Sequence, residues 1–113
     1  MDKETIVKEM GDALQEAILQ IDPQISLTSK QMFGGAGFWA DGVIFAAWFG
    51  NTLALKLDED ARRDLLELPE ARTSDYMKAY IETPPEFLND GDVLAQWVEK
   101  SLTYIRKNRK KSR

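Results

Sequence analysis

The sequence predicts a two-layer α+β domain in which helices cover an antiparallel sheet. Two observations favour this class. Apolar residues recur at helical spacing near both ends of the chain, and the middle holds strand-like segments separated by tight-turn residues. With 113 residues, 43% of them hydrophobic, the chain is large enough for one core. We expect one domain over residues 1–105, followed by a basic, flexible tail over residues 106–113.

The predicted order of elements is α-β-β-β-α-β-α, with room for one further short strand. The first element is an amphipathic helix over residues 4–21. Its apolar residues are spaced by three or four positions, which places them on one face: Ile6, Val7, Met10, Leu14, Ala17, Ile18 and Ile21. Asp22-Pro23 ends the helix, because a residue that precedes proline is disfavoured in the α region.

The centre of the chain predicts strands. Residues 25–33 mix β-branched and polar side chains, residues 38–40 are short and aromatic, and residues 43–49 form an unbroken apolar run. Between the last two segments, Asp41-Gly42 suits the positive φ angles of a two-residue type I′ hairpin. Gly50-Asn51 predicts a second tight turn of the same kind.

A third strand of this meander follows the second turn. Leu53, Leu55 and Leu57 alternate with Ala54 and Lys56, which predicts one buried face and one more exposed face. The three hairpin-linked strands therefore form an antiparallel meander.

The second half of the chain predicts a helix, a strand and a last helix. Asp58-Glu59-Asp60 suits a helix N-terminus, the apolar residues Ala61, Leu65 and Leu68 follow, and Pro69 ends the helix. After a loop over residues 70–75, alternation predicts a strand over residues 77–82 that Pro84-Pro85 ends. The last helix is expected to be capped near Asp90 or Asp92, with this buried stripe: Val93, Leu94, Trp97, Val98, Leu102 and Ile105.

The sequence contains no histidine and no cysteine. Ser-His-Asp and Cys-His nucleophile pairs and His- or Cys-based zinc sites therefore cannot be assembled. We interpret Asp58-Glu59-Asp60 as a solvated helix start, and Asn89-Asp90-Gly91-Asp92 as a helix cap, since it lacks the ligand alternation and distal glutamate of a calcium loop. We expect no catalytic residue, cofactor or metal. An enzyme using carboxylates or Lys30 is the alternative.

Clustered glycines mark the centre of the chain, at Gly34, Gly35 and Gly37. Glycine-rich loops can turn backbone N–H groups toward a phosphate, but the dinucleotide fingerprint needs other spacings and a helix directly after them. Here Phe38 and Trp39 begin a strand. We therefore interpret the glycines as a turn or bulge between strands, with a phosphate loop as the alternative. Most of the aromatic residues suit a core, whereas Trp39 on a short strand is a candidate partner contact.

The net charge of −4 is distributed unevenly. Residues 1–99 hold 8 basic and 19 acidic residues, a net charge of −11, while the last 14 residues hold seven basic and no acidic ones. Basic residues in the tail could neutralise nucleic-acid phosphates: Arg106, Lys107, Arg109, Lys110, Lys111 and Arg113. The alternative is that they complement the helix dipole and solvate the end of the chain, since an acidic body repels a polyanion.

The N-terminus lacks the pattern of a secretory signal, and no apolar run approaches the roughly 20 residues that cross a bilayer. The absence of cysteine favours the cytosol. We expect a soluble, cytoplasmic protein without membrane contact.

Several short motifs follow one another along the chain: Lys30, Met32-Phe33-Gly34-Gly35, Gly37, Asp41-Gly42, and a strand ending Leu55-Lys56-Leu57-Asp58. Together they resemble the N-terminal domain of the TfoX/Sxy family, and residues 77–84 with the Trp97 helix resemble its closing half. The similarity spans roughly residues 4 to 105. Gln31 stands where the family has a second basic residue, and a counterpart of the family's helical second domain is missing, which implies a stand-alone relative.

The resemblance implies a secretion-chaperone-like two-layer fold without catalytic residues. Members of this family are bacterial regulators of natural competence that assist a transcription factor at DNA-uptake promoters. We therefore expect a regulatory or adaptor domain that binds a protein, of which a transcription factor is the implied class, through the exposed sheet or the glycine turn. Direct nucleic-acid binding by the tail is the alternative. Antiparallel sheet edges also leave a homodimer open.

Overall fold

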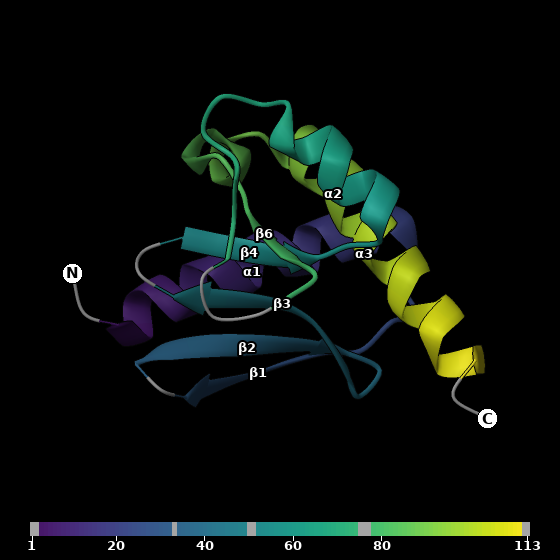
Figure 1. Ribbon diagram of the computed structural model, residues 1–113. Helices are drawn as coiled ribbons and strands as arrows, with labels where there is room; N and C mark the ends of the chain where they lie inside the picture. The colour runs from purple at the N-terminus through teal and green to yellow at the C-terminus, as the bar shows by residue number, and fades with distance from the viewer. Residues whose placement is uncertain (1–2, 33, 50–51, 75–77, 112–113) are drawn as a thin grey trace.

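The computed structural model describes residues 3–32, 34–49, 52–74 and 78–111 and shows two layers, with α1 and α3 behind an antiparallel sheet (Figure 1). The six strands are ordered β1-β2-β3-β4-β6-β5. The elements are α1 (Lys3–Ile21), β1 (Leu27–Met32), β2 (Gly35–Ala40), β3 (Val43–Phe49), β4 (Thr52–Lys56), α2 (Glu59–Leu66), β5 (Arg72–Thr73), β6 (Tyr80–Glu82), the 3-10 helix η1 (Pro85–Asn89) and α3 (Gly91–Lys111). The predicted α+β class is confirmed.

Two predicted strands begin three residues away from where the structure begins them. The strand expected over residues 38–40 begins earlier, at Gly35, so that β1 and β2 form a hairpin of six residues on each side. Among the described residues, four strands precede α2, where the predicted order has three, and the two-residue β5 adds a further short strand after α2. The strand expected over residues 77–82 begins only at Tyr80, because Ala79 has a φ of 73°, which interrupts extended backbone; Met77 lies outside the described residues.

The main core lies between the sheet and the two long helices. From α1 it takes Val7, Met10, Leu14, Ala17 and Ile18, and from α3 it takes Leu94, Ala95, Val98, Leu102 and Ile105. The predicted apolar stripes of both helices are therefore confirmed, with four members only half-buried: Ile6, Ile21, Val93 and Trp97. Leu68 is a correction: it lies beyond the end of α2 and is 36% exposed, whereas Ala61 and Leu65 are buried as predicted.

The predicted helix starts are also confirmed. Asp58 is the N-cap of α2, and its Oδ1 accepts a hydrogen bond from the backbone N–H of Ala61 at 2.8 Å. Asp90 does the same for α3, accepting from the backbone N–H of Val93 at 3.2 Å. Arg62 strengthens the start of α2, since its guanidinium donates to the carbonyl of Leu57 at 2.6 Å.

The turn between β2 and β3 has the predicted geometry. Asp41 has a φ of 49° and Gly42 a φ of 85°, and positive values at both central positions are those of a type I′ turn. The second predicted turn, Gly50-Asn51, lies outside the described residues; the strands on either side of it pair, with Phe49 opposite Thr52.

An irregularity in β3 changes which of its residues face the core. Phe38 pairs with Ala46 and Trp39 pairs with Ile44, so Phe45 has no partner on β2. This is a β-bulge, in which one strand carries an extra residue. Phe45 and Ala46 are both fully buried, and the Ser101 hydroxyl of α3 donates to the Phe45 carbonyl at 3.1 Å. A side chain from the helix layer therefore satisfies the backbone group at the bulge.

We predict that Ser101→Ala lowers the free energy of unfolding by about 1 to 2 kcal/mol, because the buried Phe45 carbonyl loses the hydrogen bond from the Ser101 hydroxyl. Thr103→Ala is the matched control, since its hydroxyl bonds to the carbonyl of Glu99 on the exposed side of the same helix. Urea unfolding of both variants measures the difference. Equal losses in the two variants would contradict a specific role for the Ser101 bond.

Candidate functional site on the open sheet face

The helices cover one face of the sheet, which we call the inner face, and leave the outer face to solvent and to shorter segments (Figure 1). Along β2, Ala36, Phe38 and Ala40 belong to the main core, so Gly37 and Trp39 are on the outer face. The same alternation, corrected for the bulge, assigns these residues to the outer face: Thr28, Lys30, Ile44, Ala47, Phe49, Ala54, Lys56, Tyr80 and Glu82.

The middle of the outer face is closed by a second, small cluster. Ala47, Ala54 and Tyr80 are buried together, and Phe49 packs against them. This corrects the expectation that Ala54 and Lys56 lie on a more exposed face. Ala54 is only 4% exposed, whereas Lys56 is half-buried. Burial raises the pKa of Tyr80 from 10.0 to about 12, because the phenolate loses hydration in this cluster.

The outer face of the first three strands is different. Trp39 and Ile44 pair across β2 and β3, are half-buried, and belong to neither core cluster. On β1, the exposed Thr28 lies opposite Trp39, and the exposed Lys30 lies opposite Gly37. We call Thr28, Lys30, Trp39 and Ile44 the Trp39 patch. Across the sheet from Lys30 lie first Gly37 and then Ala47, so the two nearest residues on this face have little or no side chain.

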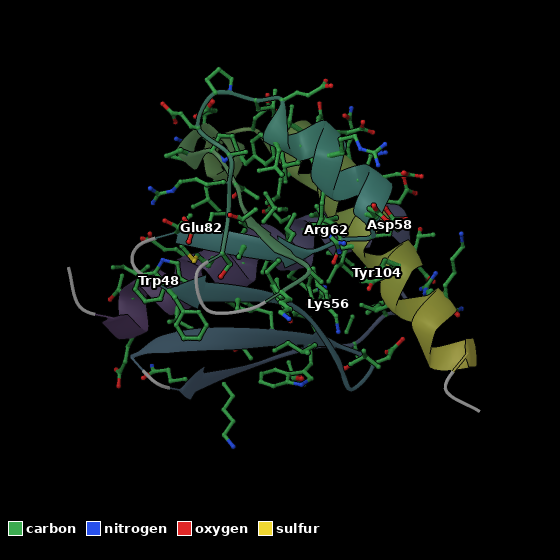
Figure 2. The ribbon with its side chains drawn as sticks, in the orientation of Figure 1. Trp48, Lys56, Asp58, Arg62, Glu82 and Tyr104 are labelled. Carbon is green, nitrogen blue, oxygen red and sulfur yellow. The ribbon has the colours of Figure 1, made fainter. Side chains whose placement is uncertain are left out.

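Charge on this face is basic at two points. Lys30 lies at the β1 edge, and Lys56 lies at the end of β4, next to the start of α2 with Asp58 and Arg62 (Figure 2). Within the described part of the chain, neither lysine takes part in an ion pair. The arrangement combines a half-exposed aromatic and aliphatic pair with two lysines that form no ion pair within the described residues.

The glycine motif serves the hairpin between β1 and β2. Gly34 has a φ of 78°, which favours glycine at the turn. Gly35 is buried where strands come close, since a Cβ there would contact the Trp48 carbonyl and the Phe49 ring. A strand follows these glycines instead of a helix. The interpretation as a strand-to-strand turn is confirmed, and the phosphate-loop alternative is wrong in this respect.

The predicted motif residues lie along the β1–β2 hairpin and at both ends of β2. Lys30 and Trp39 are in the patch, and the glycines shape the backbone beneath and beside it. Asp41 has a different position: it exchanges hydrogen bonds with Ser26, donating from its N–H to the Ser26 carbonyl and accepting from the Ser26 N–H at Oδ1, each at 2.9 Å. The backbone of Met32 is in β1, and Phe33 lies outside the described residues.

The predicted basic tail continues α3. Arg106 and Lys107 are exposed, Arg109, Lys110 and Lys111 are within the helical span, and Arg113 lies outside the described residues. Arg106 forms an ion pair with Asp22 at 3.4 Å and lines a cavity of about 50 Å³ together with Asp41. The base of the tail thus lies near the β2–β3 turn, and its nucleic-acid role stays a prediction.

Of the acidic residues at the start of α2, Glu59 and Asp60 are exposed and Asp58 is a half-buried cap. Glu59 and Asp60 lie 3.9 and 3.7 Å from Arg63 on the same helix, and a groove of about 310 Å³ between α2 and α3 is lined by Asp60, Asp64 and Glu99. Among the described residues, no group of three or more acidic side chains could hold a metal ion. No helix in the described ranges is long and apolar enough to cross a bilayer.

Sequence reasoning missed Ile44 as a member of the patch and Tyr80 as a member of the second cluster. Ile44 is hidden in an unbroken apolar run, where no polar neighbours mark the outward positions. Tyr80 lies two residues from both Lys78 and Glu82, a pattern that predicts the polar side of its strand. The pairing of Ala47 with Ala54, two small residues on adjacent strands, is the feature that could have indicated room for a large ring above them.

Helices on one face of an antiparallel sheet, with an apolar and basic patch on the other, define a two-layer α+β domain with one open sheet surface. Residues 20–105 match the family described as TfoX N-terminal domain, and the chain belongs to this family. The match begins in the last turn of α1 and includes the whole sheet. Comparison with curated proteins finds no match. The family is not known as one of enzymes.

We predict that Gly35→Ala strongly destabilises the protein, by roughly 2 kcal/mol or more, because the new methyl group overlaps backbone that cannot move without breaking the β2–β3 ladder. Gly91→Ala is the control, since a Cβ at Gly91 meets no atom within 4 Å. Thermal unfolding measures both. A Gly35→Ala variant as stable as Gly91→Ala would show that the motif glycine is not required for packing.

We also predict a loss of stability at high pH that depends on Tyr80. The folded state raises this pKa above its ordinary value, so the contribution of the neutral phenol is complete below pH 10 and is lost as the pH rises toward 12. The part of this contribution that is lost between pH 10 and pH 12 is about 2 kcal/mol. Tyr80→Phe removes this component, so the wild type should lose more unfolding free energy than the variant between pH 10 and pH 12. Parallel losses would contradict the prediction.

Proposed function

We propose that this chain is a regulatory or adaptor domain of the TfoX type that binds another protein through the Trp39 patch. The observation that carries the proposal is the position of Trp39 and Ile44: paired, half-exposed and in contact with neither core cluster. Large apolar side chains that a fold does not use for its own core are the residue types that dominate binding energy at protein interfaces.

The surroundings of the patch indicate the chemistry of the partner. Lys30 and Lys56 lie on the same face, while the rest of the body carries a large excess of acidic residues. A partner that places an apolar side chain over Trp39 and Ile44, with acidic residues on either side, would match both the apolar centre and the basic rim. The same partner would be repelled elsewhere on the acidic body, which favours this face.

Family membership supports the regulatory role. The resemblance to TfoX/Sxy regulators makes a transcription factor the proposed class of partner, and co-regulation of transcription linked to competence, inside the cell, the proposed setting. The glycine, Asp-Gly and lysine motifs that characterise the resemblance all lie in or beside the strands that carry the patch. The motifs and the patch therefore share the same three strands.

We predict that Trp39→Ala and Lys30→Glu each weaken partner binding, Trp39→Ala by about tenfold or more, because an interfacial tryptophan commonly contributes 2 kcal/mol or more. Immobilised full-length chain is used to capture proteins from native lysate, captured proteins are identified by mass spectrometry, and the affinity of the purified candidate is then measured for each variant. Circular dichroism confirms that the variants fold.

Matched controls remove the same chemistry elsewhere. Leu19→Ala deletes an apolar side chain that is 51% exposed on α1, and Lys8→Glu reverses an exposed charge on the same helix. Both should bind the partner as the wild type does. Binding that Trp39→Ala leaves unchanged would exclude the patch. If nucleic acid alone is retained at low salt, and removal of residues 106–113 abolishes it, the tail hypothesis is the correct one.

A further inference from the structure

The two edges of the sheet are not alike. β5, at one edge, has two residues, whereas β1, at the other, has six and pairs with β2 in an unbroken register without proline or bulge. Edge strands present a row of unpaired N–H and C=O groups, and proteins usually shorten, bend or cover them. β5 is short in this way and β1 is not. Its single charged residue, Lys30, has its side chain on the outer face, away from the free backbone groups.

The hydrogen bonds at the start of β1 show which backbone groups are free. Asp41 N–H donates to the Ser26 carbonyl, so the backbone of Ser26 points toward β2. Backbone direction alternates along an antiparallel strand, so Thr28 and Lys30 also bond toward β2. Leu27, Ser29 and Gln31 then direct their N–H and C=O groups outward. Within the described ranges, no strand or loop bonds to them on that side.

These outward groups can be satisfied by a second copy of β1 in one register. Residues directly opposite each other in an antiparallel pair have their side chains on the same face of the sheet. In a symmetric dimer, one residue of β1 must therefore lie opposite its own copy, at the twofold axis. An axis at Lys30 would place the two lysines directly opposite each other in a non-hydrogen-bonded pair, where the two side chains are closest. An axis at Ser29 instead makes Ser29 its own partner, places Leu27 opposite Gln31, and places Thr28 opposite Lys30. The free backbone groups of Leu27, Ser29 and Gln31 in each copy are then all paired, which gives about six backbone hydrogen bonds between the two strands.

We propose that β1 pairs antiparallel with β1 of a second copy of this chain, with the twofold axis at Ser29, so that the two sheets form one continuous sheet. The axis is perpendicular to the sheet, so both outer faces point the same way. Thr28 of each Trp39 patch lies against Lys30 of the other copy, and the two patches become one surface. The dimer does not rest on the proposed partner binding: it uses the strand edge, and partner binding uses the outer face.

Because the natural chain contains no cysteine, single-cysteine variants test the register directly. In the proposed dimer, residue 29 of the two copies is a hydrogen-bonded pair with a Cα separation of about 5.5 Å, within the range of a disulfide. Residue 31 of one copy is about 14 Å from residue 31 of the other, too far to be bridged. Under mild oxidation, Ser29→Cys should give disulfide-linked dimer at about ten times the yield of Gln31→Cys.

The mass of the full-length chain in solution gives a second readout. Light scattering should show the wild type and Ser29→Ala as dimers at high protein concentration, and Ser29→Pro as a monomer. Proline at 29 removes an N–H that points outward and leaves the bonds from β1 to β2 in place. A monomeric wild type, a dimeric Ser29→Pro, or equal cross-linking of the two cysteine variants would each overturn the proposal. If Ser29→Pro fails to fold, the cysteine pair decides.

Discussion

One extra residue in β3 determines how the rest of the domain is arranged. A regular strand over residues 43–49 would alternate, and its large side chains would be divided evenly between the two faces. The bulge at Phe45 instead directs Phe45, Ala46 and Trp48 to the inner face and leaves Ile44 outside. The bond from Ser101 to the Phe45 carbonyl joins this irregular point to α3. The inner core and the composition of the outer face thus depend on the same local distortion.

The outer face divides into two parts with different physical character. Above β3, β4 and β6 it is packed, because Tyr80 covers two alanines and is itself buried enough to raise its pKa. Above β1, β2 and the start of β3 it is open, with Trp39 and Ile44 half-exposed. The boundary follows the small residues Gly37 and Ala47, which pair across β2 and β3. Stability is therefore concentrated in one half of this face and recognition, as proposed, in the other.

Much of the fold could be predicted from the sequence, because its determinants are local. Helical spacing in α1 and α3, the caps Asp58 and Asp90, and the Asp41-Gly42 turn each depend on a few neighbouring residues, and each is confirmed. The bulge could not be predicted, since its cause is a register between β2 and β3 and a hydroxyl 56 residues away along the chain. The same limit applies to the site. Lys30 and Trp39 are visible as motif residues, but Ile44 joins them only through the bulge.

The continuity of α3 has a mechanical consequence. Because the helix runs without a break from Gly91 to Lys111, its cationic end is not attached through a hinge. It projects as an arm of a rod about 30 Å long, whose other half is embedded in the core. A force applied to the end of that arm is transmitted as a torque to the buried half of the helix, where Ser101 contacts the sheet. The last turns of α3 are thereby joined through one rigid helix to the point where Ser101 bonds to β3.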